Sequence, residues 1–232
     1  MDKLPISLCL FVKNESKNIR DAIESVYSIV SEVVIVDTGS TDNTVELCKK
    51  YTNRVYQVGF TDFGSIRSLC VALASQPFIL TLDADEVVMP GDWPGFAELI
   101  SLSSLGVKGD NLELDKQGQV VIDSWAFRRY RWSDRWMTRR EDISAGDDWQ
   151  VRFFRNRPDR GIKYVRRVHE TIHGCARTER TNLVIIHHFQ NQHKSKEDLF
   201  RRQELYTRLY QEDLDEGVEH TEPPVADADR VF

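Results

Sequence analysis

The first ninety residues alternate between short apolar runs and amphipathic stretches, and this alternation constrains the fold more than any other feature of the sequence. Runs at 6–12, 33–36, 54–60 and 78–82 have the length of buried strands. Between them, apolar residues recur at three- and four-residue steps, as they do on one face of a helix. A strand–helix repeat at this spacing predicts βαβ units and a parallel sheet.

Beyond Pro90 the alternation weakens, and the second half of the chain is expected to be less regular. The expected elements are a helix at 96–102, strands at 119–130, 149–154, 163–168 and 183–189, and a charged amphipathic helix at 195–214. The tail from Glu216 has few large apolar residues, so we expect it to be flexible.

Composition narrows the class of protein. The formal net charge is -6, so the chain lacks the overall positive charge of a typical nucleic-acid-binding protein. The four cysteines are scattered without a CxxC pair, which predicts reduced thiols in a cytoplasmic chain. The N-terminus lacks the pattern of a signal peptide, and no apolar run approaches the ~20 residues that span a bilayer.

Acidic side chains gather where the fourth predicted strand ends. Asp83, Asp85 and Glu86 follow this apolar strand, where they repel one another and lose hydration. Two aspartates separated by one residue suit a divalent cation, and hard oxygen ligands favour Mg²⁺ or Mn²⁺. A lone DxD pattern also occurs in solvated turns and helix caps. Polar clusters at 13–15 and 37–42 are expected at the same carboxyl edge, where open α/β sheets bind ligands.

Several segments together resemble the family-2 glycosyltransferases of the GT-A fold. They are LFVKNES at 10–16, VVIVDTGSTDNT at 33–44, the segment 63–67, LTLDADE at 80–86 and, in outline, VRFFRN, GIKYVRRVHE and IIHHF up to about residue 190. The similarity is greatest to small bacterial lipopolysaccharide-core glucosyltransferases and peptide S-glycosyltransferases. It implies an α/β fold with a mostly parallel, Rossmann-like central sheet flanked by helices.

The resemblance also implies a division of the chain. A GT-A domain would span 1–192, with a donor half at about 1–90 and an acceptor half at about 91–192. A C-terminal helix at 193–215 and a flexible tail at 216–232 would follow.

The resemblance assigns residues to the nucleotide of a nucleotide-sugar donor, for which UDP is the commonest carrier. Asp37 matches the acid that accepts a hydrogen bond from the base. Asn14 and Glu15 match the first-strand motif beside the base and ribose. The sequence therefore predicts a nucleotide pocket at the ends of the first two strands.

The resemblance places a second group of residues near the ribose and diphosphate. Arg67 matches an arginine expected near the pyrophosphate or the first DxD acid, although Ser68 replaces the family's asparagine. Asp83, followed by Ala84, matches the ribose side, and Asp85 matches the metal ligand. A Mn²⁺ or Mg²⁺ ion would bridge Asp85 and the diphosphate, and would supply the positive charge that the acidic cluster lacks.

The activity implied is a metal-dependent, inverting transfer of a sugar to a glycan, lipid-linked or peptide acceptor. Such a transfer needs a carboxylate base on the acceptor side. Asp148, in the pair Asp147-Asp148, is the first candidate and Glu170 the second, although the aspartate pair also fits an exposed loop. An inactive module that binds a nucleotide-sugar or glycan is the alternative, and turnover separates the two.

Histidines raise two further possibilities. A C-terminal histidine completes the metal or diphosphate site of many GT-A enzymes, and we favour His187 over His188, although both also fit structural roles. Residues 169–173 read HETIH, a literal zinc-protease motif. Its β-branched flanks and the glycine that follows predict a strand or turn in place of the helix that the motif needs.

A basic aromatic segment at 128–140 stands out in this acidic chain. Its arginines and aromatic residues suit an acceptor, a peripheral membrane surface or, less well, nucleic acid. They also suit a solvated strand whose arginines pair with Asp134, Glu141 and Asp142. The position between the donor half and the candidate base favours a role in acceptor recognition.

Overall fold

The computed structural model describes residues 2–103, 122–133, 136–137, 148–189 and 194–219. Their strands are β1 (Leu4–Val12), β2 (Val30–Asp37), β3 (Val55–Gln57), β4 (Phe78–Thr81), β5 (Glu86–Val88), β6 (Ser124–Arg131), β7 (Trp149–Arg155), β8 (Lys163–Val165), β9 (Thr171–His173) and β10 (Thr178–His188). Their helices are α1 (Ile19–Tyr27), α2 (Thr44–Cys48), α3 (Phe63–Ala72), α4 (Trp93–Leu102) and α5 (Lys196–Asp215), with short 3-10 helices η1 (Pro90–Asp92) and η2 (Pro158–Arg160).

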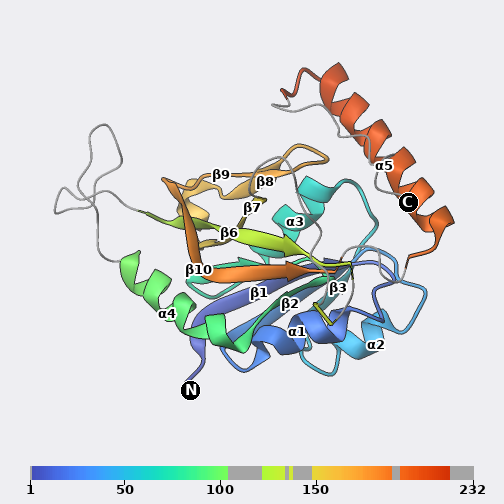
Figure 1. Ribbon diagram of the computed structural model, residues 1–232. Coiled ribbons are helices and arrows are strands. Elements are labelled where there is room, and N and C mark those ends of the chain that lie inside the picture. The colour runs from blue at the N-terminus through green and yellow to red at the C-terminus, as the bar shows by residue number, and fades with distance from the viewer. Residues whose placement is uncertain (1, 104–121, 134–135, 138–147, 190–193, 220–232) are drawn as a thin grey trace.

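The described strands form one eight-stranded sheet, in the order β3-β2-β1-β4-β7-β6-β10-β5, and a separate pair, β8-β9 (Figure 1). Four of the seven pairings in the large sheet are parallel. The predicted α/β fold with a mostly parallel central sheet is therefore confirmed.

The parallel half of the sheet brings three distant segments to one edge. Val12 at the end of β1 pairs with Asp37 at the end of β2, and Cys9 of β1 pairs with Thr81 at the end of β4. Because these strands run in the same direction, the residues that follow them leave the sheet together. The polar clusters predicted at this edge are thus neighbours in space.

Three strands in the second half of the sheet differ from the prediction. β6 spans Ser124–Arg131, whereas the predicted strand is 119–130, of which 119–121 lie outside the described residues. β10 begins at Thr178, five residues before the predicted start, because its first half alternates exposed and half-buried residues and has no apolar run. β5 was not predicted, since it is three residues long and begins with the charged Glu86. It pairs with β10 in the antiparallel direction, so that Glu86 faces His188 across the ladder.

Helices cover both faces of the large sheet (Figure 1). On one face, the apolar stripe of α1 packs into the main core together with Phe96 and Leu99 of α4. On the other face, Ile66 and Cys70 of α3 form a smaller core with Tyr164 of β8. Ser68, which departs from the family pattern, joins α3 to β8, because its hydroxyl donates to the carbonyl of Tyr164 and accepts from the amide of Tyr164. Helices on both faces of the sheet therefore form a three-layer scaffold.

The turn after β8 is held under strain between α3 and α5. Arg166 and His169 have left-handed backbones, with φ of 71° and 52°, which non-glycine residues seldom adopt. Gly64 of α3 lies so close that a Cβ there would collide with the backbone carbonyl of Arg166. From the other side, the carboxylate of Asp213 in α5 accepts from both the amide and the guanidinium of Arg167. Packing on both sides thus fixes the position of residues 166–170.

The C-terminal helix α5 begins with a capping box, in which Ser195 and Asp198 satisfy each other's backbone amides. Most of the predicted tail, from residue 220 onward, falls outside the described residues. None of the helices that the structure describes combines the length and apolar character needed to cross a membrane. All four cysteines are free, and Cys9, Cys48 and Cys70 are buried.

Candidate active site

Two chain segments meet at the carboxyl ends of β1 and β2. Asn14, which has a left-handed backbone with φ of 55°, accepts a hydrogen bond on Oδ1 from the amide of Thr41 at 2.7 Å. The amide of Asn14 donates to the Ser40 hydroxyl at 2.9 Å, and the amide of Glu15 donates to the Thr44 hydroxyl at 2.8 Å. The structure therefore brings the predicted nucleotide residues Asn14 and Glu15 against the 38–44 turn.

Asp37 is fully buried at the base of this turn. Its carboxylate accepts from the amides of Gly39 and Ser40 at 3.2 Å and from the side-chain amide of Gln57 at 3.3 Å. Gly39 has φ of 99°, so the tight turn depends on a residue without a Cβ. Asp37 thus organises the turn, and Gln57 is a neighbour that the sequence did not single out.

A continuous chain of alternating charges runs beneath the edge of the sheet. In spatial order its members are Glu170, Arg67, Asp83, Arg152, Glu86, Arg129, Asp148 and Arg131. Neighbours along this charge chain are joined by ion pairs of 2.6–3.2 Å. Four guanidinium groups balance four carboxylates, which is what makes the burial of these groups tolerable.

The centre of the charge chain is deeply buried. Glu86 is inaccessible to solvent, and its Oε1 accepts from both Arg129 and Arg152. Burial alone would raise the pKa of Asp83, but attraction to Arg152 and Arg67 holds it well below its usual range. Burial would likewise lower the pKa of Arg67, and its attraction to Asp83 and Glu170 raises it instead. Asp83 and Arg67 are therefore ionised at neutral pH.

The arginines change the interpretation of the acidic cluster. Asp83 and Glu86 obtain their positive charge from Arg67, Arg152 and Arg129, so a metal is needed for neither of them. Asp85 differs, because none of the described arginines or lysines lies within ion-pair distance of its carboxylate. Within this segment, the acid that retains its capacity to bind a cation is Asp85.

Asp85 lies beside His188 of β10, with its Oδ2 3.4 Å from the histidine Nε2. Burial would raise the pKa of Asp85, but the charge of His188 and a hydrogen bond from it lower the pKa to about 2. The other ring nitrogen of His188, Nδ1, is buried and has no hydrogen-bond partner among the described residues. An aspartate and an imidazole with an unsatisfied nitrogen are thus adjacent at the site.

His187, the histidine favoured from the sequence, lies elsewhere. Its Nδ1 accepts a hydrogen bond from the indole of Trp132 at 2.9 Å, and the two rings stack with centroids 5.8 Å apart. Successive residues of a strand point to opposite faces of the sheet, so only one of the two histidines can face Asp85. The structure brings His188 to that position.

The two candidate bases are bound differently. Both carboxylate oxygens of Asp148 are engaged, Oδ2 by Arg129 at 2.8 Å and Arg131 at 3.2 Å, and Oδ1 by Gln150 at 2.9 Å. Burial raises the pKa of Asp148, but Arg129 and these hydrogen bonds lower it overall. Glu170 accepts from Arg67 through Oε1 alone. Asp147 lies outside the described residues.

The HETIH residues do not form the helix that a zinc protease requires. His169 has a left-handed backbone, and Thr171–His173 form strand β9. No group of three or more histidine, cysteine or acidic side chains is arranged to hold a metal in the part of the chain that the structure describes. The protease interpretation is therefore wrong.

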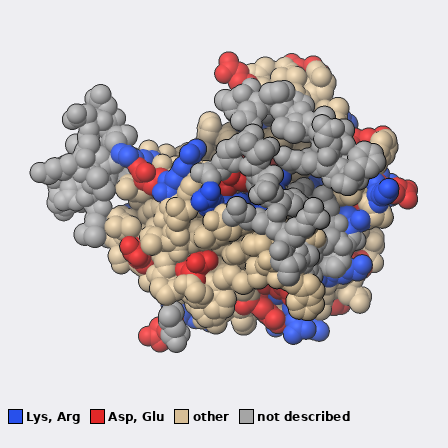
Figure 2. Space-filling model, viewed as in Figure 1, with Lys and Arg blue, Asp and Glu red and all other residues tan. Residues whose placement is uncertain are grey.

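The basic aromatic segment contributes to the charge chain. Arg129 and Arg131 pair with Asp148, whereas Asp134, Glu141 and Asp142 lie outside the described residues. On the face in Figure 2, basic and acidic side chains of the described residues lie side by side, without a broad area of one sign. Part of the positive charge that stood out in the sequence is thus neutralised within the fold.

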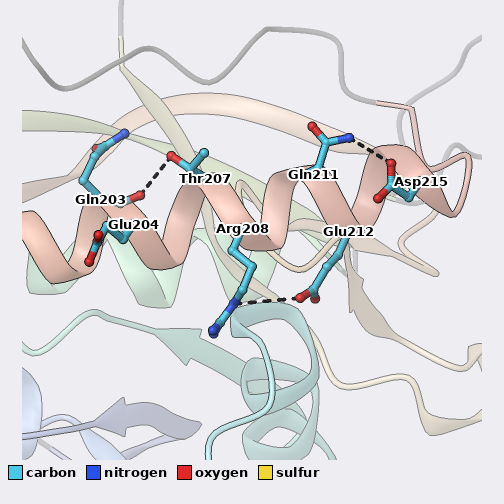
Figure 3. A pocket seen from close by; sticks show the side chains of 7 residues that line it. All are labelled: Gln203, Glu204, Thr207, Arg208, Gln211, Glu212 and Asp215. Carbon is cyan, nitrogen blue, oxygen red and sulfur yellow. Dashed lines mark hydrogen bonds and ion pairs between the residues drawn. The ribbon is translucent and has the colours of Figure 1, made fainter.

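A hollow of about 530 Å³ lies on the outer side of α5 (Figure 3). Its lining consists of polar residues on one face of that helix: Gln203, Glu204, Thr207, Arg208, Gln211, Glu212 and Asp215. Figure 3 shows three interactions along the helix: the Thr207 hydroxyl donates to the backbone carbonyl of Gln203, the Gln211 side chain donates to Asp215, and Arg208 pairs with Glu212. None of the candidate active-site residues lines this hollow, so we do not assign it a role in the chemistry.

An open α/β sheet with an acidic segment at the carboxyl edge of its parallel strands is the arrangement expected of the GT-A fold. Residues 7–161, more than half of the chain, match the sequence profile of glycosyl transferase family 2. The chain belongs to glycosyl transferase family 2.

Relatives of known sequence agree with this assignment. The chain is 29% identical over 171 residues to a TPR repeat-containing protein of Synechococcus elongatus, an alignment that covers 72% of this chain and 35% of the relative. It is 36% identical over 81 residues to the uncharacterized glycosyltransferase RC0292 of Rickettsia conorii, covering 35% and 29%. It is 33% identical over 89 residues to the lipopolysaccharide core biosynthesis glycosyltransferase LpsC of Rhizobium meliloti, covering 36% and 33%. The aligned part of the chain spans about a third of these relatives.

Solved structures share the fold. The crystal structure of S. aureus TarS matches with a TM-score of 0.56 at 16% identity, covering 88% of this chain and 39% of that one. Residues 1–349 of TarS in complex with UDP-GlcNAc match with a TM-score of 0.53 at 15% identity, covering 89% and 66%. At this level of identity the likeness establishes the fold.

Proposed function

We propose that the chain transfers a sugar from a UDP-sugar to a glycan, lipid-linked or peptide acceptor, in a metal-dependent reaction that inverts the anomeric centre. The observation that carries the proposal is the pairing of Asp85 with His188 at the edge of the sheet. The complex of TarS with UDP-GlcNAc supports UDP as the carrier, because that protein has a similar fold.

The residues at the ends of β1 and β2 suit the nucleotide. Asn14, Glu15 and Asp37 border one turn, and their side chains and backbones hold its shape through mutual hydrogen bonds. A turn fixed in this way offers a base and ribose a preformed surface, which lowers the entropy lost on binding. Asp83 and Ala84 begin the adjacent segment and complete the ribose side of the proposed pocket.

The donor atoms at Asp85 fit Mg²⁺ or Mn²⁺. Mg²⁺ is commonly held by one or two protein ligands together with substrate phosphates, and Mn²⁺ also accepts an imidazole nitrogen. Asp85 and His188 would supply the two protein ligands, His188 through Nε2, the ring nitrogen that lies 3.4 Å from the Asp85 carboxylate. The ion, when bound, would act as a Lewis acid on the leaving diphosphate.

The proposed reaction is a single displacement. A bond forms between the acceptor oxygen or sulfur and the anomeric carbon, while the bond from that carbon to the diphosphate oxygen breaks. The acceptor proton passes to a carboxylate. We favour Glu170 over Asp148 as this base, because Oε2 of Glu170 has no hydrogen-bond partner among the described residues whereas both oxygens of Asp148 are engaged.

Paired substitutions test the choice of base. If Glu170 is the base, Glu170→Gln lowers the rate of sugar transfer to water or acceptor and leaves the KM for the donor unchanged. Asp148→Asn is then expected to lower the rate less, because Asp148 would not receive the proton and would only hold Arg129 and Arg131 in position. The reverse order of effects would return the role to Asp148.

A second pair of substitutions tests the metal ligand. His188→Gln is expected to weaken Mn²⁺ binding, measured by the electron paramagnetic resonance of free Mn²⁺ in the presence of UDP. His187→Gln, in the adjacent position, should bind Mn²⁺ as the wild type does. Equal Mn²⁺ affinity of the wild type and both variants would show that His188 is not a metal ligand.

For the acceptor, we propose only its chemical class. The segment 128–140 borders the site through Arg129 and Arg131 and includes Trp136, whose surface is 85% exposed. An exposed tryptophan beside arginines suits a lipid-linked acceptor at a membrane surface. Sedimentation with anionic vesicles, compared between the wild type and Trp136→Ala, tests this peripheral association.

The function itself is tested by nucleotide release from UDP-, GDP-, dTDP- and CDP-sugars with Mn²⁺, Mg²⁺ or EDTA. Metal-dependent release from a UDP-sugar, absent in Asp85→Ala, is the expected result. Release from another donor would change the carrier and keep the reaction. Binding without release, even with acceptors supplied, would favour the inactive binding module.

A further inference from the structure

The C-terminal helix α5 contacts the start of α3 and the turn after β8, near the residues of the proposed site. Lys194, just before the helix, forms an ion pair with Glu15 at 3.1 Å. Two turns into the helix, the ring of Tyr206 lies 5.0 Å from that of Phe63 at the start of α3 and 5.9 Å from that of His169. Arg167 ties the far end of the helix down through Asp213 and Glu216. These contacts hold the helix near its start, middle and end, and Figure 1 shows it at the right of the view, on the side of α3.

Arg202 is half-buried on the inner side of α5 and differs from the other arginines of the site. Its guanidinium donates to the Tyr206 hydroxyl at 3.3 Å and lies 5.3 Å from the centre of that ring. Arg67, Arg129 and Arg152 all have carboxylates within 3.2 Å, whereas none of the described carboxylates lies within ion-pair distance of Arg202. The Arg202 guanidinium, which has no carboxylate partner among the described residues, could therefore bind an anion.

The charge of Arg202 is directed toward the DxD segment. Burial would lower its pKa, but attraction to Tyr206 and then to Asp85 and Asp83 raises it. The aspartates are thus close enough to interact electrostatically, yet they make no direct contact. Arg202 also contacts Tyr206, whose ring in turn contacts His169, so this cation lies near the turn that carries Glu170.

We infer that Arg202 binds the diphosphate of the donor, so that the C-terminal helix completes the donor site. A guanidinium has a planar fork of donors that matches phosphate oxygens, and a diphosphate is the anion that the proposed reaction brings to Asp85. The inference rests on the proposed function and adds a residue from a separate part of the chain. It gives α5 a role in substrate binding as well as in packing.

The test compares Arg202→Gln and Arg202→Lys with Arg201→Gln, the adjacent arginine, whose exposed side chain pairs with Glu197 along the helix. Calorimetry measures the binding of UDP and of uridine, each with Mg²⁺. Loss of a charge-assisted hydrogen bond is expected to weaken UDP binding by Arg202→Gln at least about tenfold. Uridine binding should not change, Arg202→Lys should retain part of the affinity for UDP, and Arg201→Gln should match the wild type.

Three results would overturn the inference. UDP binding by Arg202→Gln equal to that of the wild type would show that the diphosphate does not need this residue. An equal loss of UDP and uridine binding, together with a lower melting temperature, would show that Arg202 only holds α5 in place. Failure of the wild type to bind UDP or the other nucleoside diphosphates would overturn the proposed function itself.

Discussion

Asp83 and Asp85 are two residues apart, yet they lie in opposite electrostatic surroundings. Asp83 belongs to the charge chain, where Arg67 and Arg152 each approach to 2.8 Å. Asp85 has one ion-pair partner among the described residues, His188, at 3.4 Å. The comparison teaches that acidic side chains in one motif divide between structure and chemistry according to whether the fold supplies their counter-charge.

The largest expected effect on activity comes from substitution of Asp85, the acid that has no arginine partner among the described residues. Asp85→Asn should lower nucleotide release by about three orders of magnitude, since Lewis-acid stabilisation of a leaving group is worth several kcal/mol. Its melting temperature should fall less than that of Glu86→Gln, because the ion pair it breaks among the described residues is the single 3.4 Å contact with His188. The exposed Asp159, which pairs with Arg157, provides the control Asp159→Asn. Release at the wild-type rate by Asp85→Asn would contradict the division between the two regions.

The opposite behaviour is expected in the charge chain. Glu86→Gln removes a charge that Arg129 and Arg152 share in the interior, so it should lower the free energy of unfolding by about 3 kcal/mol. Urea unfolding measures this change. Glu24→Gln, which breaks an exposed pair with Arg20, should alter stability by less than about 1 kcal/mol. A Glu86→Gln protein as stable as the wild type would show that the charge chain does not hold the fold together.

A smaller loss is expected where α3 meets the strained turn. Gly64→Ala places a methyl group against the carbonyl of Arg166 and should destabilise the protein by about 2 kcal/mol through overpacking. The displaced turn carries Glu170, so the rate of sugar transfer should fall as well. Gly59→Ala is the control, because a Cβ there meets no atom within 4 Å. Equal stability of the two variants would mean that the turn moves without resistance.

The smallest effect concerns pH. The pKa of Asp148 is lower in the folded chain than in the unfolded chain, so the folded chain binds fewer protons and its ion pairs contribute stability above the ordinary aspartate pKa of about 4. That contribution is lost as pH falls below this value toward the folded pKa. The stability difference between the wild type and Asp148→Asn, measured in urea, should therefore shrink from pH 7 to pH 3. A difference that does not depend on pH would argue that Asp148 acts through its shape alone.

The sequence by itself determined the parallel half of the sheet, because apolar runs and helical periodicity report burial along a local stretch of chain. The order of the strands then brought 13–15, 37–42 and the DxD segment to one edge, as parallel topology requires. β5 and the first half of β10 escaped prediction, because their residues are polar or few and gain their strand pairing from distant segments.

Only the tertiary structure decided which charges meet. Arg67 and Glu170 are 103 residues apart, and Arg152 and Asp83 are 69 apart, so no local pattern pairs them. A charged residue in the apolar run VRFFR was the one signal that could have indicated a buried partner for Arg152. The choice between His187 and His188 likewise depends on which face of β10 turns toward Asp85, and strand pairing sets that face. Local periodicity specifies which residues are buried. The long-range register of the sheet specifies which acid lacks an arginine partner in the described part of the chain and can therefore bind a cation.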